Sequence, residues 1–371
     1  MNNSFCPLPF SHLAVRPNGK VYPCCIFDWA HVPDDLDLNH PDVFNHPFMQ
    51  DIREKMKNNE SVPGCNRCYS NEEITGNSTR MFFYNNAKEF ELPVEPTNAP
   101  ELKYVDLALS NTCNNKCRMC NAELSTSWYA DAKALGLPIP KGILRQDQIL
   151  KQYDLSKLRF IKMIGGEPLM EQDKFIDILK RCDRKNLKIL LTTNATLIPN
   201  DELFSLLKEC KDVTINLSID AYGKLNDFLR KGSKWEKTEE TLSWFYKNFN
   251  SRNITIHSVV NIYNVNKIDQ LYTFIKEHFS DAGLSIVMID GPDWMHPRHL
   301  PEQVKREIIS LVKMWYEITK KEFCNLLIKE LEKTGDFRLF MKNDEKLNSL
   351  RKEHWKDVNP ELFKMVSNFY E

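Results

Sequence analysis

The stretch DLALSNTCNNKCRMCN, residues 106–121, joins the end of a strand-like segment to three closely spaced cysteines. The run 107–110 leads into a loop that holds Cys113, Cys117 and Cys120. Three thiolates in one loop can converge on an iron–sulfur cluster, but a fully ligated four-iron cluster takes four cysteines. The loop therefore predicts a cluster with one open iron, at a strand end where a small molecule can be bound and activated.

The pattern C-x3-C-x2-C, with Met119 before the third cysteine, resembles the radical S-adenosylmethionine (SAM) enzymes. The resemblance implies that Cys113, Cys117 and Cys120 hold a catalytic [4Fe-4S] cluster whose open iron chelates SAM. Reductive cleavage of SAM then gives a 5′-deoxyadenosyl radical, which abstracts a hydrogen atom from a substrate. The alternative is a zinc site, but zinc usually takes two C-x2-C pairs, which this spacing does not supply.

A second cysteine group lies in residues 1–90. Asn18-Gly19 between two strand-like runs predicts a hairpin that brings Cys6 near Cys24. The order of a lone cysteine, PNGKVYPCC, a short helix at 48–57 and GCNRC resembles the SPASM/twitch type of auxiliary-cluster domain. That resemblance implies a second, auxiliary [4Fe-4S] cluster with the ligands Cys6, Cys24, Cys65 and Cys68, and with Cys25 as the alternative to Cys24.

This N-terminal segment departs from the usual pattern, because such domains generally follow the radical SAM core and this one precedes it. The departure leaves the placement of the second cluster relative to the substrate open. A structural zinc site with four cysteine ligands is the alternative that the spacing permits.

Composition sets broad limits on the class of protein. The chain has 371 residues, 42% of them hydrophobic, and 50 basic against 51 acidic residues. This balance lacks the overall excess of basic residues that is typical of nucleic-acid-binding proteins. The first ten residues do not read as a signal peptide, and no apolar run is long enough to span a membrane. Eleven cysteines then favour a reducing, cytoplasmic location in which thiols bind metal.

From residue 103 onward, strand-like and helical patterns alternate, which predicts a parallel α/β architecture. The expected strands are 103–109, 159–164, 187–193, 212–219, 254–262 and 284–289, with helices that include 173–182, 201–210 and 236–249. Six such units match the partial (β/α)6 TIM-like barrel of the radical SAM fold. We expect an auxiliary domain at 1–90, a linker at 91–101, the barrel at 102–291, and a lid loop with helices at 292–371.

The strands also alternate in polarity. In 212–220, Val213, Ile215 and Leu217 share one face, while polar residues share the other. Period two assigns the apolar face to the covering helices and the polar face to the barrel interior. Because a closed barrel would be packed with apolar residues, the pattern predicts an interior open to SAM and a polar substrate. Asp106 and His257 lie on such faces and are candidates to contact substrate.

The strand ends carry the candidate SAM-binding residues. After the second strand, Gly165-Gly166-Glu167-Pro168 combines backbone access with a carboxylate that can accept hydrogen bonds from an amine. The resemblance implies that this segment binds the methionyl amino group. It implies further SAM contacts at Met119, Asn194, Ser218, Asp220, Arg230 and Asn261. The alternative is that Asp220 is a helix cap and Arg230 a surface charge, without contact to SAM.

Auxiliary domains of this type accompany enzymes that often modify peptides or proteins, so a peptide or protein is the first expected substrate. A small polar metabolite, such as a sugar or nucleotide, is the second expectation, with dehydrogenation or epimerisation as the reaction. A flavodoxin- or ferredoxin-type protein is the expected electron donor. A third interpretation is a non-enzymatic, metal-stabilised binding or electron-carrier protein, which would have no use for Gly165–Pro168.

Overall fold

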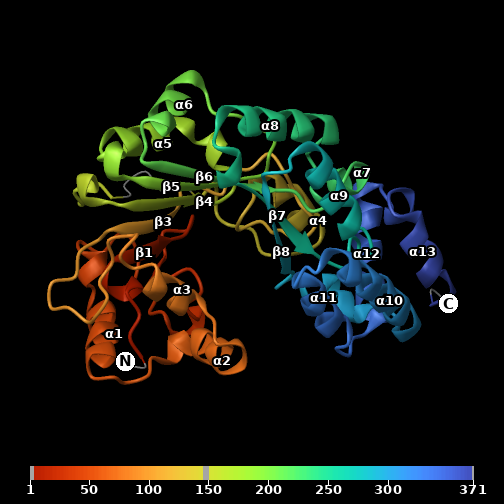
Figure 1. Ribbon diagram of the computed structural model, residues 1–371, viewed down its shortest axis with the longest axis horizontal. Coiled ribbons are helices and arrows are strands. Elements are labelled where there is room, and N and C mark those ends of the chain that lie inside the picture. Colours follow the sequence, from red (N-terminus) through yellow and green to blue (C-terminus); the bar gives the residue numbers. More distant parts are fainter. Residues whose placement is uncertain (1–3, 145–149, 370–371) are drawn as a thin grey trace. The chain divides into compact units, whose positions relative to one another are not determined.

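The computed structural model describes residues 4–144 and 150–369. Within these residues, eight strands form one mostly parallel sheet in the order β2-β1-β3-β4-β5-β6-β7-β8 (Figure 1). The strands are β1 (His12–Val15), β2 (Val21–Tyr22), β3 (Tyr104–Ala108), β4 (Phe160–Ile164), β5 (Lys188–Thr193), β6 (Asp212–Ser218), β7 (Ile254–Val260) and β8 (Gly283–Met288). Strands β3 to β8 are the six that the sequence predicts, with ends shifted by one or two residues.

The N-terminal hairpin is part of this sheet. Strands β1 and β2 pair antiparallel, with Ala14 opposite Tyr22, as the Asn-Gly turn predicts. Strand β1 also pairs in parallel with β3, and Ala14 lies opposite Asp106. The hairpin therefore extends the barrel strands, an arrangement that the sequence pattern did not predict.

The chain divides into two compact units that interleave along the sequence. Unit 1 is Met1–Thr112, Lys141–Thr192 and Pro199–Thr214, and unit 2 is Cys113–Pro140, Thr193–Ile198 and Ile215–Glu371. The domain boundaries drawn from the sequence stay a prediction.

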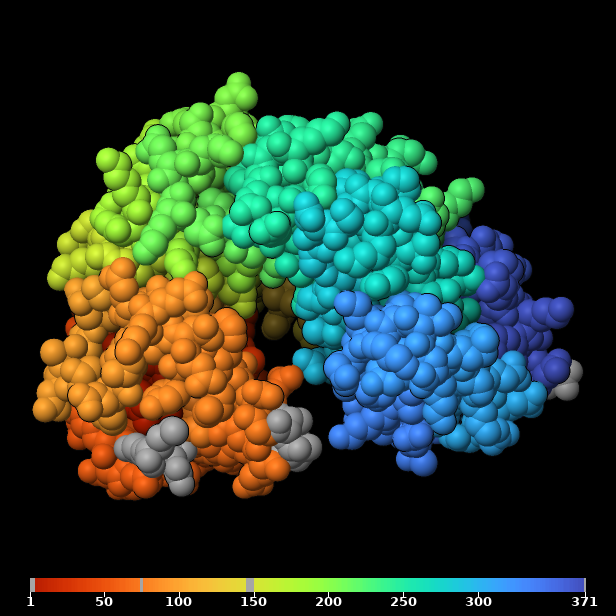
Figure 2. Space-filling model, in the orientation of Figure 1, coloured from red at the N-terminus to blue at the C-terminus, as the bar shows by residue number. Residues whose placement is uncertain are grey.

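In unit 1, helices lie on both sides of the strands. Helices α5 (Gln172–Lys180) and α6 (Asp201–Lys208) lie on one side of β4 and β5 in Figure 1, and the N-terminal helices lie on the other. These N-terminal helices are α1 (Pro47–Lys57), α2 (Asn66–Thr75) and α3 (Thr79–Asn85). Their core packs Phe10, Met56 and Phe83 with Tyr104 of β3. The space-filling view shows these N-terminal residues in red to orange (Figure 2).

Unit 2 contains helices α4 (Tyr129–Ala134), α7 (Lys224–Leu229), α8 (Trp235–Asn248), α9 (Ile268–His278), α10 (Glu302–Thr319), α11 (Phe323–Leu331), α12 (Phe337–Arg351) and α13 (Pro360–Val366). Its core joins Val260 of β7 to Ile308 of α10, Phe340 of α12 and Trp355. Of the helices described, none is long and apolar enough to cross a membrane.

Side-chain alternation in the central strands follows the expected period of two. In β6, Val213, Ile215 and Leu217 are buried and their polar neighbours are half-buried. Strand β7 alternates in the same way. Strand β3 differs, because all five of its residues are buried, including Asp106. The polar face of β3 is therefore enclosed by protein.

Candidate functional site

The loop after β3 holds its three cysteines on a fixed backbone. Cys113 and Cys117 are buried, whereas Cys120 is half-buried. Lys116 N and Arg118 N donate to Lys231 O and Leu229 O at 2.7 and 2.8 Å, which ties the loop to the end of α7. The three sulfurs are close enough that charge on Cys113 raises the pKa of both Cys117 and Cys120. The structure therefore brings the three predicted ligands together.

Burial is the main influence on these thiols. It raises the pKa of Cys117 to about 12 and that of Cys120 to about 11. The Arg230 guanidinium acts in the opposite direction on both. Because thiolates, not thiols, ligate iron, assembly of a cluster on this loop releases protons.

Arg118, between Cys117 and Met119, anchors the loop to the C-terminal helices. Its side chain is fully buried and lies over the Phe228 ring at 3.7 Å. Its Nη2 donates to Asn348 Oδ1 at 2.5 Å and to Glu353 Oε1 at 3.0 Å. Sequence reasoning missed this residue, because an arginine between two cysteines carries no signal about its distant partners.

Asn194, a predicted SAM contact at the end of β5, lies beside a cluster ligand. Its Nδ2 approaches Cys113 Sγ at 3.8 Å and donates to Asn114 Oδ1 at 2.8 Å. Thr196 Oγ1 donates to Asn194 Oδ1 at 2.6 Å, which fixes the amide orientation. A donor near a ligating sulfur is one means by which a protein tunes the potential of a cluster.

Asp220 and Arg230 form a buried ion pair next to the cysteines. The Arg230 Nε lies 2.8 Å from Asp220 Oδ2, and its Nη2 donates to Asp220 Oδ1 at 3.0 Å. Asp220 also accepts from Val259 N at 2.9 Å. Burial would lower the pKa of Arg230, but Asp220 and the sulfurs of Cys117 and Cys113 outweigh it and raise that pKa. The alternative of a surface charge is wrong, because Arg230 is only 8% exposed.

The Gly-Gly-Glu-Pro turn packs against the segment that enters the cysteine loop. Gly165 has a φ of 125°, a conformation that favours glycine. Glu167 N donates to Thr112 O at 2.8 Å, and the Glu167 carboxylate accepts from Leu169 N at 3.1 Å. The glycines therefore allow a close approach of two backbone segments, in addition to any access they give to a ligand.

Replacing Gly166 with alanine should destabilise this turn. A Cβ at Gly166 would lie 2.2 Å from Thr112 O and 2.7 Å from the Asn111 carbonyl carbon, which are backbone atoms that cannot rotate away. We expect a loss of about 2 kcal/mol in the free energy of unfolding of the apo-protein, measured with urea, together with loss of SAM cleavage.

The matched control for this substitution is Gly283→Ala. Its Cβ would lie 3.2 Å from the Thr255 hydroxyl, a side-chain atom that can move. We expect a change of about 0.5 kcal/mol or less. Equal stability of the Gly166 and Gly283 variants would contradict the close-approach interpretation.

The N-terminal cysteines form a second group within unit 1. Cys6, Cys24, Cys65 and Cys68 line one small cavity together with Arg80. Burial raises the pKa of Cys6 and Cys24 and raises that of Cys65 to about 12. The structure therefore brings together the four cysteines that the sequence grouped.

Cys25 faces a different set of residues. Burial and the charge of Asp106 raise the pKa of its thiol, whereas Lys162 and Arg16 lower that pKa. Cys24, and not Cys25, is therefore among the residues that line the cavity, and which of the two ligates a cluster stays a prediction.

Asp106, a predicted substrate contact, is the centre of a buried polar cluster. His12 Nε2 and Lys162 Nζ lie 3.6 Å from its two carboxylate oxygens, and Tyr104 donates to it. Burial alone would raise the pKa of Asp106, but His12, Lys162 and the Tyr104 hydroxyl hold it below the usual value. His12 Nδ1 in turn lies 3.0 Å from Pro23 O, next to Cys24. The cluster links the cysteine-bearing loop to β3.

The remaining predicted contacts with SAM or substrate lie in β6, in or just after β7, and in the cysteine loop. Asn261 is fully buried, with its Oδ1 accepting from Tyr263 N at 3.0 Å. His257 lies on β7, with Nδ1 3.3 Å from Ser285 Oγ. Ser218 is half-buried at the end of β6, and Met119 packs on the core of unit 2. Their contacts with SAM or substrate stay predictions.

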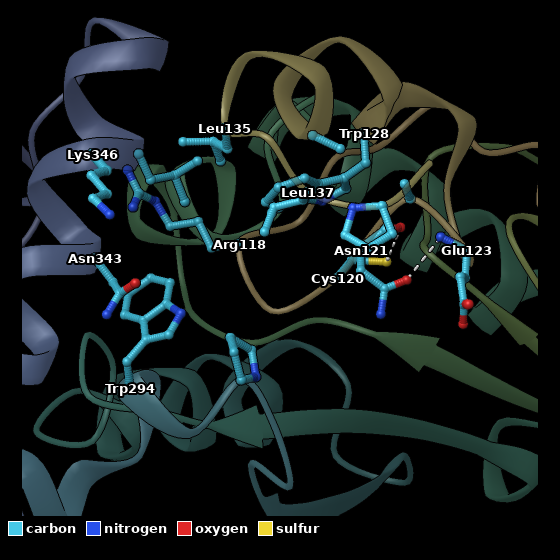
Figure 3. Close-up of a pocket in the computed structure, with 15 residues that line it drawn as sticks. Arg118, Cys120, Asn121, Glu123, Trp128, Leu135, Leu137, Trp294, Asn343 and Lys346 are labelled. Carbon is cyan, nitrogen blue, oxygen red and sulfur yellow. Dashed lines mark hydrogen bonds between the residues drawn. The ribbon is translucent and has the colours of Figure 1, made fainter. Parts of the chain in front are cut away.

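A pocket of about 440 Å³ opens beside Cys120 within unit 2 (Figure 3). Trp128 and Leu135 come from the segment after the cysteine loop, Trp294 from the loop after β8, and Leu347 from α12. Figure 3 shows Lys346 and Asn343 on one side of the pocket, with Cys120, Asn121 and Glu123 on the other. Volume and lining are those of a site for a small ligand or a side chain.

Two family models match the chain. Residues 107–275 match the radical SAM superfamily, and residues 6–69 match the SPASM family, an iron-sulfur cluster-binding domain. The chain therefore carries a radical SAM domain at residues 107–275, with a SPASM domain on its N-terminal side at residues 6–69. The predicted family, fold class and order of the two domains are confirmed.

Individual relatives match the chain in part. The GTP 3′,8-cyclase of Aliarcobacter butzleri (strain RM4018) is 25% identical over 129 residues, which are 33% of this chain and 36% of the relative. The solved structure of anSMEcpe with bound AdoMet shares 20% identity over 58% of this chain and 61% of its own, with a TM-score of 0.42. Streptococcus suis SuiB bound to precursor peptide SuiA shares 19% identity over 58% of this chain and 46% of its own, with a TM-score of 0.38.

The cofactors of these families fit the residues present. A radical SAM domain implies a [4Fe-4S] cluster and SAM, and a SPASM domain implies auxiliary iron–sulfur clusters. The loop offers three converging thiols for the first cluster, and the N-terminal cavity offers four for a second. Across residues 4–144 and 150–369, no three Asp, Glu, His or Cys side chains are grouped as ligands of a single metal ion.

Proposed function

We propose that this radical SAM enzyme modifies a peptide or protein by abstracting a hydrogen atom from one of its residues. The observation that supports a peptide substrate is the pocket beside Cys120. Its wall consists largely of tryptophan, leucine, proline and alanine. Such walls suit an apolar or aromatic side chain of a peptide. Asn121, Glu123, Asn343 and Lys346 also line the pocket and can hydrogen-bond the backbone of such a peptide.

When bound, the cluster and SAM would supply a 5′-deoxyadenosyl radical by reductive cleavage. The chain's own residues hold and orient them. We assign Cys113, Cys117 and Cys120 to the cluster, with an electron from a flavodoxin- or ferredoxin-type donor. We assign contacts with SAM to Met119, Gly165, Gly166, Glu167, Pro168, Asn194, Ser218, Asp220, Arg230 and Asn261.

The Asp220–Arg230 pair supports this assignment by its charge. Arg230 is buried next to two cluster sulfurs, and Asp220 keeps it oriented through two contacts. A guanidinium in this place offsets the negative charge of thiolates that are removed from water. Substrate contacts of Asp106 and His257 belong to the same proposal.

We further propose that Cys6, Cys24, Cys65 and Cys68 ligate the auxiliary cluster. Four protein ligands leave no open iron, which favours electron transfer over direct binding of substrate. A small polar metabolite remains the second candidate substrate. The match to a GTP 3′,8-cyclase, whose name gives a nucleotide substrate, is what supports it.

The substrate class is tested by deuterium transfer. Reconstituted enzyme is incubated with SAM, dithionite and short peptides that carry deuterated leucine, tryptophan or phenylalanine. We expect deuterium in 5′-deoxyadenosine from at least one peptide. We also expect Trp294→Ala to raise the KM for that peptide about tenfold, because a large apolar contact is removed.

The control for this experiment is Trp29→Ala, which alters a tryptophan that is 76% exposed. It should leave the KM unchanged, and both variants should cleave SAM without peptide as the wild type does. Deuterium transfer from labelled nucleotides or sugars alone would overturn the peptide proposal and favour the metabolite.

A further inference from the structure

Arg80 forms part of the wall of the cavity that Cys6, Cys24, Cys65 and Cys68 line. Its Nε donates to Glu72 Oε1 at 2.9 Å and its Nη1 donates to Phe5 O at 3.1 Å. The side chains of Arg80 and Glu72 are only 11% and 17% exposed. Ser78 Oγ donates to the same carboxylate at 2.5 Å, so the pair is held in one geometry.

The Arg80 charge acts on the cavity. Arg80 lies in the same cavity wall as the four cysteines. Its guanidinium therefore favours negative charge on the sulfurs. Because the pair is shielded from water, this influence is stronger than that of an exposed arginine.

We propose that Arg80 and Glu72 set the reduction potential of the auxiliary cluster, an inference that rests on the four-cysteine ligand set proposed above. One-electron reduction adds one negative charge to the cluster. Arg80 stabilises the reduced form and so raises the potential. Glu72 fixes Arg80 in place and offsets part of its charge, which lowers the potential. Net charge near a cluster is one of the determinants of its potential.

This proposal predicts shifts of opposite sign from two substitutions in one ion pair. Arg80→Gln removes the cation and should lower the midpoint potential, whereas Glu72→Gln removes the anion and should raise it. If the ion pair only maintained the shape of the cavity, either substitution would break it in the same way. Both should then shift the midpoint potential in the same direction.

The test is a redox titration of reconstituted protein followed by electron paramagnetic resonance of the auxiliary cluster. For Arg80→Gln we expect at least about a tenfold change in the reduction equilibrium, which is 59 mV for a one-electron couple. Arg80→Lys keeps the charge and should recover most of the wild-type value. Arg67→Gln alters an exposed arginine between Cys65 and Cys68 and should shift the potential least.

Several outcomes would overturn the proposal. In variants that keep both clusters, Arg80→Gln and Glu72→Gln could leave the potential unshifted or shift it with the same sign. Either result would overturn the role of the ion pair but not the ligand set. A wild-type protein with only one four-iron cluster would overturn the ligand set as well. If Arg80→Gln fails to assemble a cluster, Glu72→Gln still decides: a raised potential supports the proposal and an unchanged one contradicts it.

Discussion

Replacing Cys113, Cys117 and Cys120 together with alanine should abolish SAM cleavage and leave the N-terminal cluster in place. The three thiols lie on one loop, and the charges of Cys113 and Cys120 both raise the pKa of Cys117. Their removal should lower the iron content from about eight to about four per chain, since each four-iron cluster is held by its own cysteines. Iron analysis and detection of 5′-deoxyadenosine measure the two effects.

The control for the triple variant is Cys182→Ala. Cys182 is buried at the end of α5, where its Sγ lies 3.2 Å from Ile178 O. Its removal should keep about eight irons and normal cleavage of SAM. Residual cleavage by the triple variant would contradict the assignment of the catalytic cluster.

The second prediction distinguishes the roles of two adjacent cysteines, Cys24 and Cys25. Cys24→Ala should lose the auxiliary cluster, because Cys24 lines the cavity with the other three ligands. Cys25→Ala should keep it, because Cys25 is not among the residues that line this cavity. The pair of variants is matched in sequence position and in chemistry, so any difference reports on the direction of the side chain.

The measurement is iron content together with the spectrum of the reduced auxiliary cluster. We expect about four irons in Cys24→Ala and about eight in Cys25→Ala. Both variants should still cleave SAM at the other cluster. The reverse order of iron contents would show that Cys25 is the ligand and that the cavity has been misassigned.

The strands and the cysteine groups could be predicted from the sequence because their signals are local. Period-two alternation in residues 212–218 depends only on neighbouring side chains, and the structure has β6 there. Spacing alone grouped Cys113, Cys117 and Cys120. By contrast, the choice between Cys24 and Cys25 depends on which way the chain turns after β2, which adjacent identical residues do not reveal.

Polar contacts between residues that are far apart in the chain could not be predicted from the sequence. Arg118 meets Glu353, which is 235 residues away, and Arg80 meets Phe5 O across 75 residues. Asp220 and Arg230 are close in sequence, yet a short helix between them is equally compatible with exposure. Pairing of β1 with β3 also depends on tertiary contacts, because a two-stranded hairpin satisfies the local pattern by itself.

The cluster content of the wild-type protein decides whether this chain is a radical SAM enzyme with two clusters. The wild-type protein is reconstituted anaerobically, its iron and sulfide are counted, and SAM with dithionite is then added. We predict about eight irons per chain and formation of 5′-deoxyadenosine. About four irons with one zinc would keep the catalytic site but contradict the auxiliary cluster, and absence of both iron and cleavage would contradict the account as a whole.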